Sequence, residues 1–387
     1  MTSRTYWVIS LYYAAFFGAL GIWLPYWPLF LEHEGMNPEQ IGLLTALTQG
    51  ARVLGSPVWG HLADRSNRRL VIIATSLGTL GAFSLFYFGS GFWYFALATI
   101  IYSFVHAAPL ALVDATAMEQ ASHHNRDYGR MRVWGSIGFI IAAQLVGFLL
   151  DFWSILLILP ALTLLIGADV LLGFAMPKDV SHEAHGEKSG QAIGVLSDPR
   201  LRWLYLSALL MQFSHSGYYG FFSLHMEANG FSRGEIGAFW SLGVLAEVVL
   251  MTWSKPLLNR YGASALMMIS LILASVRWAV FSATVHWLPI VLVQLLHAFT
   301  FGAYHVASVQ RLHELAPAGK RASTQAWYSA LSFGVGGGLG LAISGYLYKG
   351  VGATGLFGVM ALAATLGVAA GFRAIYLYRK HRHGMRP

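Results

Sequence analysis

The residues of this sequence that could do chemistry are ionisable side chains inside long apolar segments. Of the 387 residues, 56% are hydrophobic and only 11% are charged, whereas a typical soluble protein carries about 25% charged residues. An ionisable group at membrane depth costs several kcal/mol unless it is paired or hydrated, so such groups indicate binding or proton-transfer sites. The candidates are Arg52, Asp114, Arg132, Asp169, Glu247, Arg277, His106, His215, His297 and His305.

Asp114 and Arg132 lie on either side of a short polar turn around His123. Each is nine residues from His123, so in an antiparallel hairpin the two side chains have the same depth, about 10 Å above the turn. The two charges can therefore pair. The pair could bind a substrate, or it could be a structural ion pair that fixes two helices.

Arg52 and Glu247 occupy equivalent positions of an internal repeat, because the chain matches itself without a gap when it is shifted by 195 residues. Opposite charges at equivalent positions could pair between the two halves, as a functional or as a static pair. Glu247 is the acid that we expect to bind a coupled proton, since burial favours the protonated form of a carboxyl group. The repeat sets Leu29, Glu32, Gly35, Ile41, Gly42 and Arg65 against Leu224, Glu227, Gly230, Ile236, Gly237 and Arg260.

Polar and aromatic residues recur at helical spacing in three of the apolar segments. Aromatic stripes alone could be helix-packing surfaces, whereas stripes that also carry glutamine and histidine are more typical of a wet cavity. The stripes are Tyr12, Phe16, Trp23 and Tyr26; Gln212, His215, Tyr219 and Phe222; and Gln294, His297, Phe301, Tyr304 and Ser308. We expect substrate contacts from Tyr12, Phe16, Trp23, His215, Tyr219, His297 and Tyr304.

The balance of membrane charges indicates the kind of cargo. Asp169 is set aside, because it lies only two turns from the cytoplasmic end of its segment and is expected to reach the interface. The remaining charges have a surplus of one positive, which an anionic substrate would balance. Together with the aromatic stripes, this surplus favours an aromatic carboxylate, held by an arginine and by stacked rings. A sugar is the alternative, since a carboxylate with an arginine also binds hydroxyl groups.

Membrane-crossing helices must position these residues, because apolar segments of about 20 residues recur along the whole chain. We find none of the short alternating strands that membrane barrels require. The first segment has no evident small-residue cleavage site, so we interpret it as a retained helix rather than a signal peptide. The expected helices are 6–31, 41–60, 70–89, 92–121, 127–149, 153–175, 203–226, 235–254, 264–284, 287–314, 322–347 and 353–377.

The basic residues gather at one end of these helices. With the N-terminus placed in the cytoplasm, only Arg233 and Lys349 fall outside, Arg52, Arg132 and Arg277 lie within helices, and all others are cytoplasmic. This positive-inside bias predicts that both termini are cytoplasmic. It also accounts for the net charge of +8 without a nucleic-acid partner.

Several other kinds of chemistry are disfavoured. The chain has no cysteine, and its membrane histidines fall mostly on separate helices without metal-ligand spacing, so we expect neither a metal nor a cofactor. One G-x-G-x-x-G occurs at Gly350, Gly352 and Gly355, but in an expected external loop with no preceding strand. No G-x-x-x-x-G-K loop exists, which argues against ATP-driven transport. We therefore do not expect an enzyme.

The loop after the second expected helix contains Gly60, Asp64, Arg65, Arg68 and Arg69. A carboxylate at a helix end and an arginine cluster can pair in one conformation and separate in another, so we expect a conformational switch here. The alternative is that the arginines are only the basic residues usual in a cytoplasmic loop. This alternative does not explain the presence of Asp64. The loop resembles the G-x-L-a-D-r-x-g-r-r signature of the major facilitator superfamily, with Asn67 in the place usually held by glycine.

Further segments resemble the branch of that superfamily that holds the lactose and phenylpropionate permeases. They are residues 50–55, 127–136, 241–248 and 276–278. The resemblance implies that Asp114 and Arg132 bind substrate, and that Glu247, Arg277 and His297 take part in proton coupling. Arg52 is expected to take part as well, through its equivalence to Glu247 in the repeat. One departure is Thr300, which stands where lactose permease has the acid that releases the proton. Coupling would then have to be carried differently, by Glu247 or Asp114.

The sequence as a whole predicts an all-α membrane protein with the major facilitator fold, twelve transmembrane helices in two pseudo-symmetric six-helix bundles. The expected parts are an N-terminal bundle at 1–176, a cytoplasmic linker at 177–202, and a C-terminal bundle with a short basic tail at 203–387. We expect a monomeric symporter in the bacterial cytoplasmic (inner) membrane, working by alternating access. Its partners would be a small-molecule substrate, protons and the lipid bilayer.

Overall fold

The computed structural model describes residues 1–177, 195–317 and 320–382, and all regular structure in this part of the chain is helical. Within it, nine helical segments are long and apolar enough to cross a membrane. Most of the expected linker, residues 178–194, and the end of the expected tail, residues 383–387, lie outside the described residues. The chain is therefore a multi-pass helical membrane protein.

Two compact units make up the chain. The first comprises residues 1–185 together with 223–241, and the second comprises residues 186–222 and 242–387. Residues 223–241, which the repeat assigns to the second half of the chain, therefore make their contacts with the first unit.

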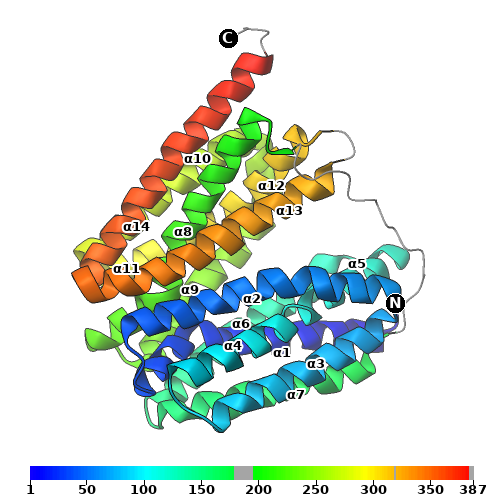
Figure 1. Ribbon diagram of the computed structural model, residues 1–387. Helices are drawn as coiled ribbons and strands as arrows, with labels where there is room; N and C mark the ends of the chain where they lie inside the picture. Colours follow the sequence, from blue (N-terminus) through cyan, green and yellow to red (C-terminus); the bar gives the residue numbers. More distant parts are fainter. Residues whose placement is uncertain (178–194, 318–319, 383–387) are drawn as a thin grey trace. The chain divides into compact units, whose positions relative to one another are not determined.

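In the first unit, α1 is the central helix and packs along α6 and α7, while α2 packs on α4, and α3 on α4 and α7 (Figure 1). Its elements are α1 (Ser3–His33), α2 (Pro38–Arg65), α3 (Arg68–Ser84), the 3₁₀ turn η1 (Leu85–Tyr87), α4 (Phe92–His106), α5 (Pro109–His123), α6 (Tyr128–Leu150), the 3₁₀ turn η2 (Ile155–Leu157) and α7 (Ile158–Ala175).

Local sequence signals explain where several of these helices begin. Asn37 accepts a hydrogen bond from the backbone N–H of Gln40 (2.9 Å), and the Gln40 side chain accepts one from the Asn37 N–H (3.0 Å). This capping box, followed by Pro38 in the first turn, starts α2. Glycine then permits close packing: a Cβ added at Gly138 of α6 would collide with the carbonyl oxygen of Ala14 in α1.

In the second unit, α10 packs against α14 and α12. Two π-helical segments interrupt its helices, which is a feature common at functional sites. The remaining elements, of which the end of α8 and the start of α9 belong to the first unit, are α8 (Pro199–Ala228), α9 (Arg233–Thr252), α10 (Ser254–Ala283), α11 (Trp287–Leu295), the π segment η4 (Ala298–Ala303), α12 (Tyr304–Leu315), α13 (Arg321–Ser329), the π segment η5 (Ala330–Gly337) and α14 (Gly338–Arg382).

Two expected loops of the second unit are kinks within helices. Helix α14 runs through the predicted boundary between 347 and 353, with Gly352 at φ 67°, and α10 bends in the same way at Gly262, with φ 76°. Glycine adopts this left-handed backbone conformation without steric cost. The predicted break before the last helix is thus present as a kink at Gly352 rather than as a longer loop, and its external location stays a prediction.

Candidate functional site

Asp114 is held in the first unit by two tyrosine hydroxyl groups. Tyr13 of α1 donates a hydrogen bond to Asp114 Oδ1 (2.6 Å), and Tyr128 of α6 donates a second one to the same oxygen (2.9 Å). The carboxyl group is half-buried, so a ligand can still reach it. The carboxylate is oriented from two helices other than its own.

Arg132 lies beside the same tyrosine without an ion pair to Asp114. Its guanidinium carbon is 3.9 Å from the ring centre of Phe17 and 5.3 Å from that of Tyr13, which are cation–π distances. No ion pair joins Asp114 and Arg132 within the described ranges, so the expected direct pair is replaced by a shared contact with Tyr13. The physical reason is that tyrosine hydroxyls already satisfy the carboxylate while ring faces hold the arginine.

A column of stacked rings runs through the same unit. His106 stacks on Phe16 (centroids 4.8 Å apart) and on Tyr102 (5.0 Å), and Tyr102 stacks on Trp23 (5.0 Å). Arg52 donates to His106 Nδ1 across 2.7 Å, and since arginine can only donate, this nitrogen carries no proton. Phe16, Trp23 and Arg52 therefore all have partners inside the unit. Their roles as substrate or coupling residues stay predictions.

Tyr12 and Asp169 are both buried in the first unit. The Tyr12 hydroxyl shares a hydrogen bond with Ser76 of α3 (3.0 Å). Asp169 is only 5% exposed, and the expectation that its side chain reaches the interface was wrong. Helix α7 packs against α1 and α3, and this side chain lies inside that packing rather than at the end of the helix.

Arg277 is the centre of a buried polar cluster in the second unit. It is fully buried, with Nη2 donating to Gln294 Oε1 (2.7 Å) and Nη1 donating to Thr300 Oγ1 (3.2 Å) and His297 Nδ1 (3.1 Å). The guanidinium carbon lies 4.6 Å from the ring centre of Tyr218. Thr300, at the position for which the resemblance implies an acid, therefore accepts a hydrogen bond from Arg277.

The hydrogen bonds fix the proton positions on two histidines. Because Nδ1 of His297 accepts from Arg277, the proton of the neutral ring is on Nε2, which lies 3.7 Å from Glu247 Oε2. Nδ1 of His215 donates to the Met211 carbonyl (2.8 Å), so its Nε2 accepts from the Thr300 hydroxyl (3.2 Å). Arg277 thus donates to Thr300, and Thr300 donates to His215. Glu247 lies on the opposite side of the cluster, beside His297.

The π segment η4 helps to build this cluster. His297 lies directly before it and Thr300 lies within it, so the wider turn decides how both side chains are presented. Glu247 packs close to Gly302 of the same segment, where an added Cβ would lie 3.1 Å from the glutamate side chain. Of the other predicted contacts, Tyr219 stacks on His215 (6.1 Å) and Tyr304 bonds Ser207 (3.2 Å).

The predicted switch residues at 60–69 make contacts within the first unit. Arg68 pairs with Glu119 of α5 (2.7 Å), and Arg69 donates to the Phe174 carbonyl at the end of α7 (2.5 Å). Asp64 and Arg65 are exposed. Sequence reasoning missed Glu119, and no local signal singles it out, because its partner lies on a different helix.

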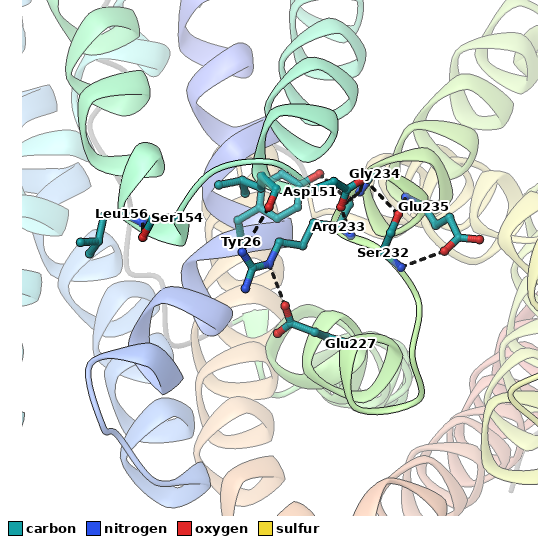
Figure 2. A network of polar contacts seen from close by, with 10 residues as sticks. Tyr26, Asp151, Ser154, Leu156, Glu227, Ser232, Arg233, Gly234 and Glu235 are labelled. Atoms are coloured by element: carbon teal, nitrogen blue, oxygen red, sulfur yellow. Dashed lines mark hydrogen bonds and ion pairs between the residues drawn. The ribbon is translucent and has the colours of Figure 1, made fainter.

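A second polar network joins the end of α6 to the start of α9 inside the first unit (Figure 2). Asp151 accepts hydrogen bonds from the backbone N–H groups of Arg233 (2.7 Å) and Gly234 (3.2 Å) and from the Ser232 hydroxyl (3.1 Å). A carboxylate at a helix N-terminus is favoured by the free N–H groups and the helix dipole. Arg233 in turn donates to Glu227 (2.7 Å).

Long apolar helices that enclose charged, hydrogen-bonded clusters are typical of membrane transporters. The chain belongs to the MFS_1-like family of the major facilitator superfamily, whose family model matches residues 6–359.

Comparison with known proteins supports the same class. The chain is 33% identical to the probable 3-phenylpropionic acid transporter of Escherichia coli (strain K12), covering 92% of this chain and 94% of that protein. It is 24% identical to the maltose permease of Geobacillus stearothermophilus, over 88% of this chain and 87% of the relative. Among solved structures, the nucleoside transporter NupG superimposes with a TM-score of 0.85 at 19% identity, covering 97% of this chain and 99% of that chain, which shows the shared fold.

Proposed function

We propose that the protein is a proton-coupled symporter for a small aromatic carboxylate such as 3-phenylpropionate, working by alternating access. The observation that carries this proposal is Arg132, a partly exposed cation set between the rings of Phe17 and Tyr13. A guanidinium binds a carboxylate through two parallel hydrogen bonds, and neighbouring rings suit an aromatic substrate. The relative described as a probable 3-phenylpropionic acid transporter supports the same cargo.

A counterflow assay tests the cargo. Purified protein in liposomes preloaded with unlabelled 3-phenylpropionate should take up labelled 3-phenylpropionate in a saturable way, while lactose should neither replace it nor compete. Protein-free liposomes are the control for passive entry of the acid. The absence of a saturable phenylpropionate signal would end this proposal.

A sugar or nucleoside is the alternative cargo. The carboxylate of Asp114 with two tyrosine hydroxyls could bind substrate hydroxyl groups, and the maltose permease among the relatives favours this reading. Counterflow of labelled maltose or uridine without phenylpropionate counterflow would support the alternative.

We propose that Glu247 binds the coupled proton, together with His297 and Arg277. The Nε2–H of His297 lies 3.7 Å from Glu247 Oε2, and Arg277 fixes this tautomer through Nδ1. Protonation of Glu247 would remove a negative charge beside the Arg277 cluster. The contacts of that cluster would therefore depend on whether Glu247 carries a proton. Glu247→Gln should keep counterflow but weaken uptake driven by a pH gradient. Uptake by the unaltered protein that is insensitive to a protonophore would indicate facilitated diffusion or exchange instead.

We further propose twelve membrane crossings with both termini in the cytoplasm of a bacterial cell. The described segment from Ser323 to His381 is 59 residues long, far more than one crossing needs, and Gly352 kinks it near the middle. Helices α2 and α8 are long enough to cross, although their charged ends lower their mean hydropathy. The protein would work as a monomer, and residues 60–69, with Gly60 and Asp64, would act as the conformational switch.

A further inference from the structure

Asp169 is a buried carboxyl group that the proposed coupling pathway does not use. It lies on α7, is 5% exposed, and its Oδ1 has no hydrogen-bond partner among the described residues. The rest of α7 is apolar apart from Thr163. A polar atom is thus kept inside helix packing without any of the contacts that usually accompany burial.

The groups near Asp169 are either neutral hydroxyl groups or side chains that already bind another residue. Tyr12 of α1, which shares a hydrogen bond with Ser76 of α3, and Tyr102 of α4 both lie within electrostatic range of Asp169.

The cations on the neighbouring helices are engaged elsewhere. Arg52 of α2 bonds His106 of α4, Arg68 of α3 pairs with Glu119, and Arg69 of α3 bonds the Phe174 carbonyl. No ion pair joins Asp169 to any of them in the described ranges. Tyr13, the other titratable residue at this level of α1, donates to Asp114.

An isolated carboxylate in this position would be strongly unfavourable. Moving an unpaired ion from water into a medium of low dielectric constant costs on the order of tens of kcal/mol, so the group takes up a proton instead. Tyr12 and Ser76 can each act as donor or acceptor, so their shared hydrogen bond can reverse when a neighbouring acid gains or loses a proton.

We propose that Asp169 is a second proton-binding site of the transporter, separate from Glu247 and located in the first unit. The carboxylic acid holds its proton in the conformation described here and gives it to water when the packing of α7 against α1 and α3 admits water. This inference rests on the proposed proton-coupled symport. It predicts that two protons move with each substrate, one through each unit.

The test is the ratio of protons to substrate in liposomes containing the purified protein. The membrane potential is clamped at zero, the initial proton influx is followed with an entrapped pH dye, and labelled 3-phenylpropionate influx is measured in parallel. Protein-free liposomes supply the background. We expect a ratio of about two for the unaltered protein and about one for Asp169→Asn, a twofold fall, while Asp169→Glu keeps the higher ratio.

Controls separate the outcomes. Thr163→Val on the same helix removes a polar group but no titratable group, so it should keep the ratio of the unaltered protein. Equal ratios above zero in the unaltered protein and in Asp169→Asn would overturn the Asp169 site alone. A ratio of zero in the unaltered protein would overturn the proposed proton coupling itself. Uptake driven by a sodium gradient and lost in Asp169→Asn would show a cation site in place of a proton site.

If Asp169→Asn does not fold, infrared spectroscopy of the unaltered protein still tests the proposal. A buried carboxylic acid gives a C=O stretch distinct from that of a carboxylate. We expect this band at neutral pH and expect it to shift in Asp169→Glu. Its absence would show that Asp169 is ionised and would overturn the proposal.

Discussion

At the scale of single residues, Tyr13 contacts both Asp114 and Arg132. Its hydroxyl bonds Asp114, and its ring lies against the Arg132 guanidinium. Tyr13 therefore helps to position both Asp114 and Arg132, the two side chains to which a substrate would bind.

Tyr13→Phe is predicted to weaken substrate binding without abolishing transport. Tyr128 still donates to Asp114, so one of two hydrogen bonds to the carboxylate is lost. A hydrogen bond to a charged group contributes about 1.5–3 kcal/mol, which corresponds to roughly 10–150-fold in affinity. Asp114→Asn should abolish counterflow with normal expression. Tyr87→Phe, whose hydroxyl bonds Thr163 away from the site, is the control, and equal affinities in all variants would show that Asp114 is structural.

Arg277→Ala is predicted to destabilise the protein strongly. The substitution removes the hydrogen bonds that Arg277 donates to Gln294 Oε1 and His297 Nδ1 and opens a cavity between rings. Removing one member of a buried charged network costs about 3–5 kcal/mol. Thermal unfolding of the purified protein in detergent measures the effect, with Arg373→Ala at an exposed position as the control. A melting temperature within a degree of the control would contradict this account.

The sequence was sufficient to find the charged residues but not their contacts. Asp114, Arg132, Glu247 and Arg277 stand out because few charges interrupt the apolar segments. Tyr13 was missed because the stripe was drawn through Tyr12 and Phe16, and a shift of one residue turns a helix face by about 100°. Asp169 was misplaced because distance from a helix end does not say which face packs inward.

At the scale of the elements, the close contact of α1 with α6 depends on glycine. A Cβ on Gly138 would meet the Ala14 backbone, and one on Gly21 of α1 would meet the backbone of Phe139. Backbone atoms cannot move aside as a flexible side chain can, so these two helices have a fixed separation.

Gly138→Ala is predicted to lower stability by about 1–3 kcal/mol, the usual effect of overpacking. Gly167→Ala in α7 is the matched control, because an added Cβ there meets no atom within 4 Å. Thermal unfolding in detergent should separate the two variants by several degrees. If Gly167→Ala were as unstable as Gly138→Ala, helix propensity or a lipid effect would have to replace the packing explanation.

Helix existence was predictable while helix ends and interruptions were not. Each expected apolar span is mostly helical, because length and hydropathy determine it, but some are broken, as 92–121 is between α4 and α5. The π segment η4, which contains Thr300, has no sequence signature of its own, and Gly352 could equally have marked a loop.

At the scale of the whole molecule, the distribution of charge predicts the orientation in the membrane. The chain contains no cysteine, so single cysteines can be introduced without background. In intact cells, Lys349→Cys should react with a membrane-impermeant maleimide, whereas Asn67→Cys should react only after the membrane is permeabilised. The opposite pattern would mean that both termini are outside and that the positive-inside bias misleads here.

The bonds of Asp151 to the start of α9 also impose an order on biosynthesis. Arg233 follows Asp151 by 82 residues, which a ribosome adds in roughly 4–16 s at about 5–20 residues per second. Helices α1 to α7 therefore enter the membrane before the helix end that Asp151 caps has been made. During this interval the carboxylate remains hydrated, and a nascent chain arrested before residue 233 lacks the last contacts of its first unit.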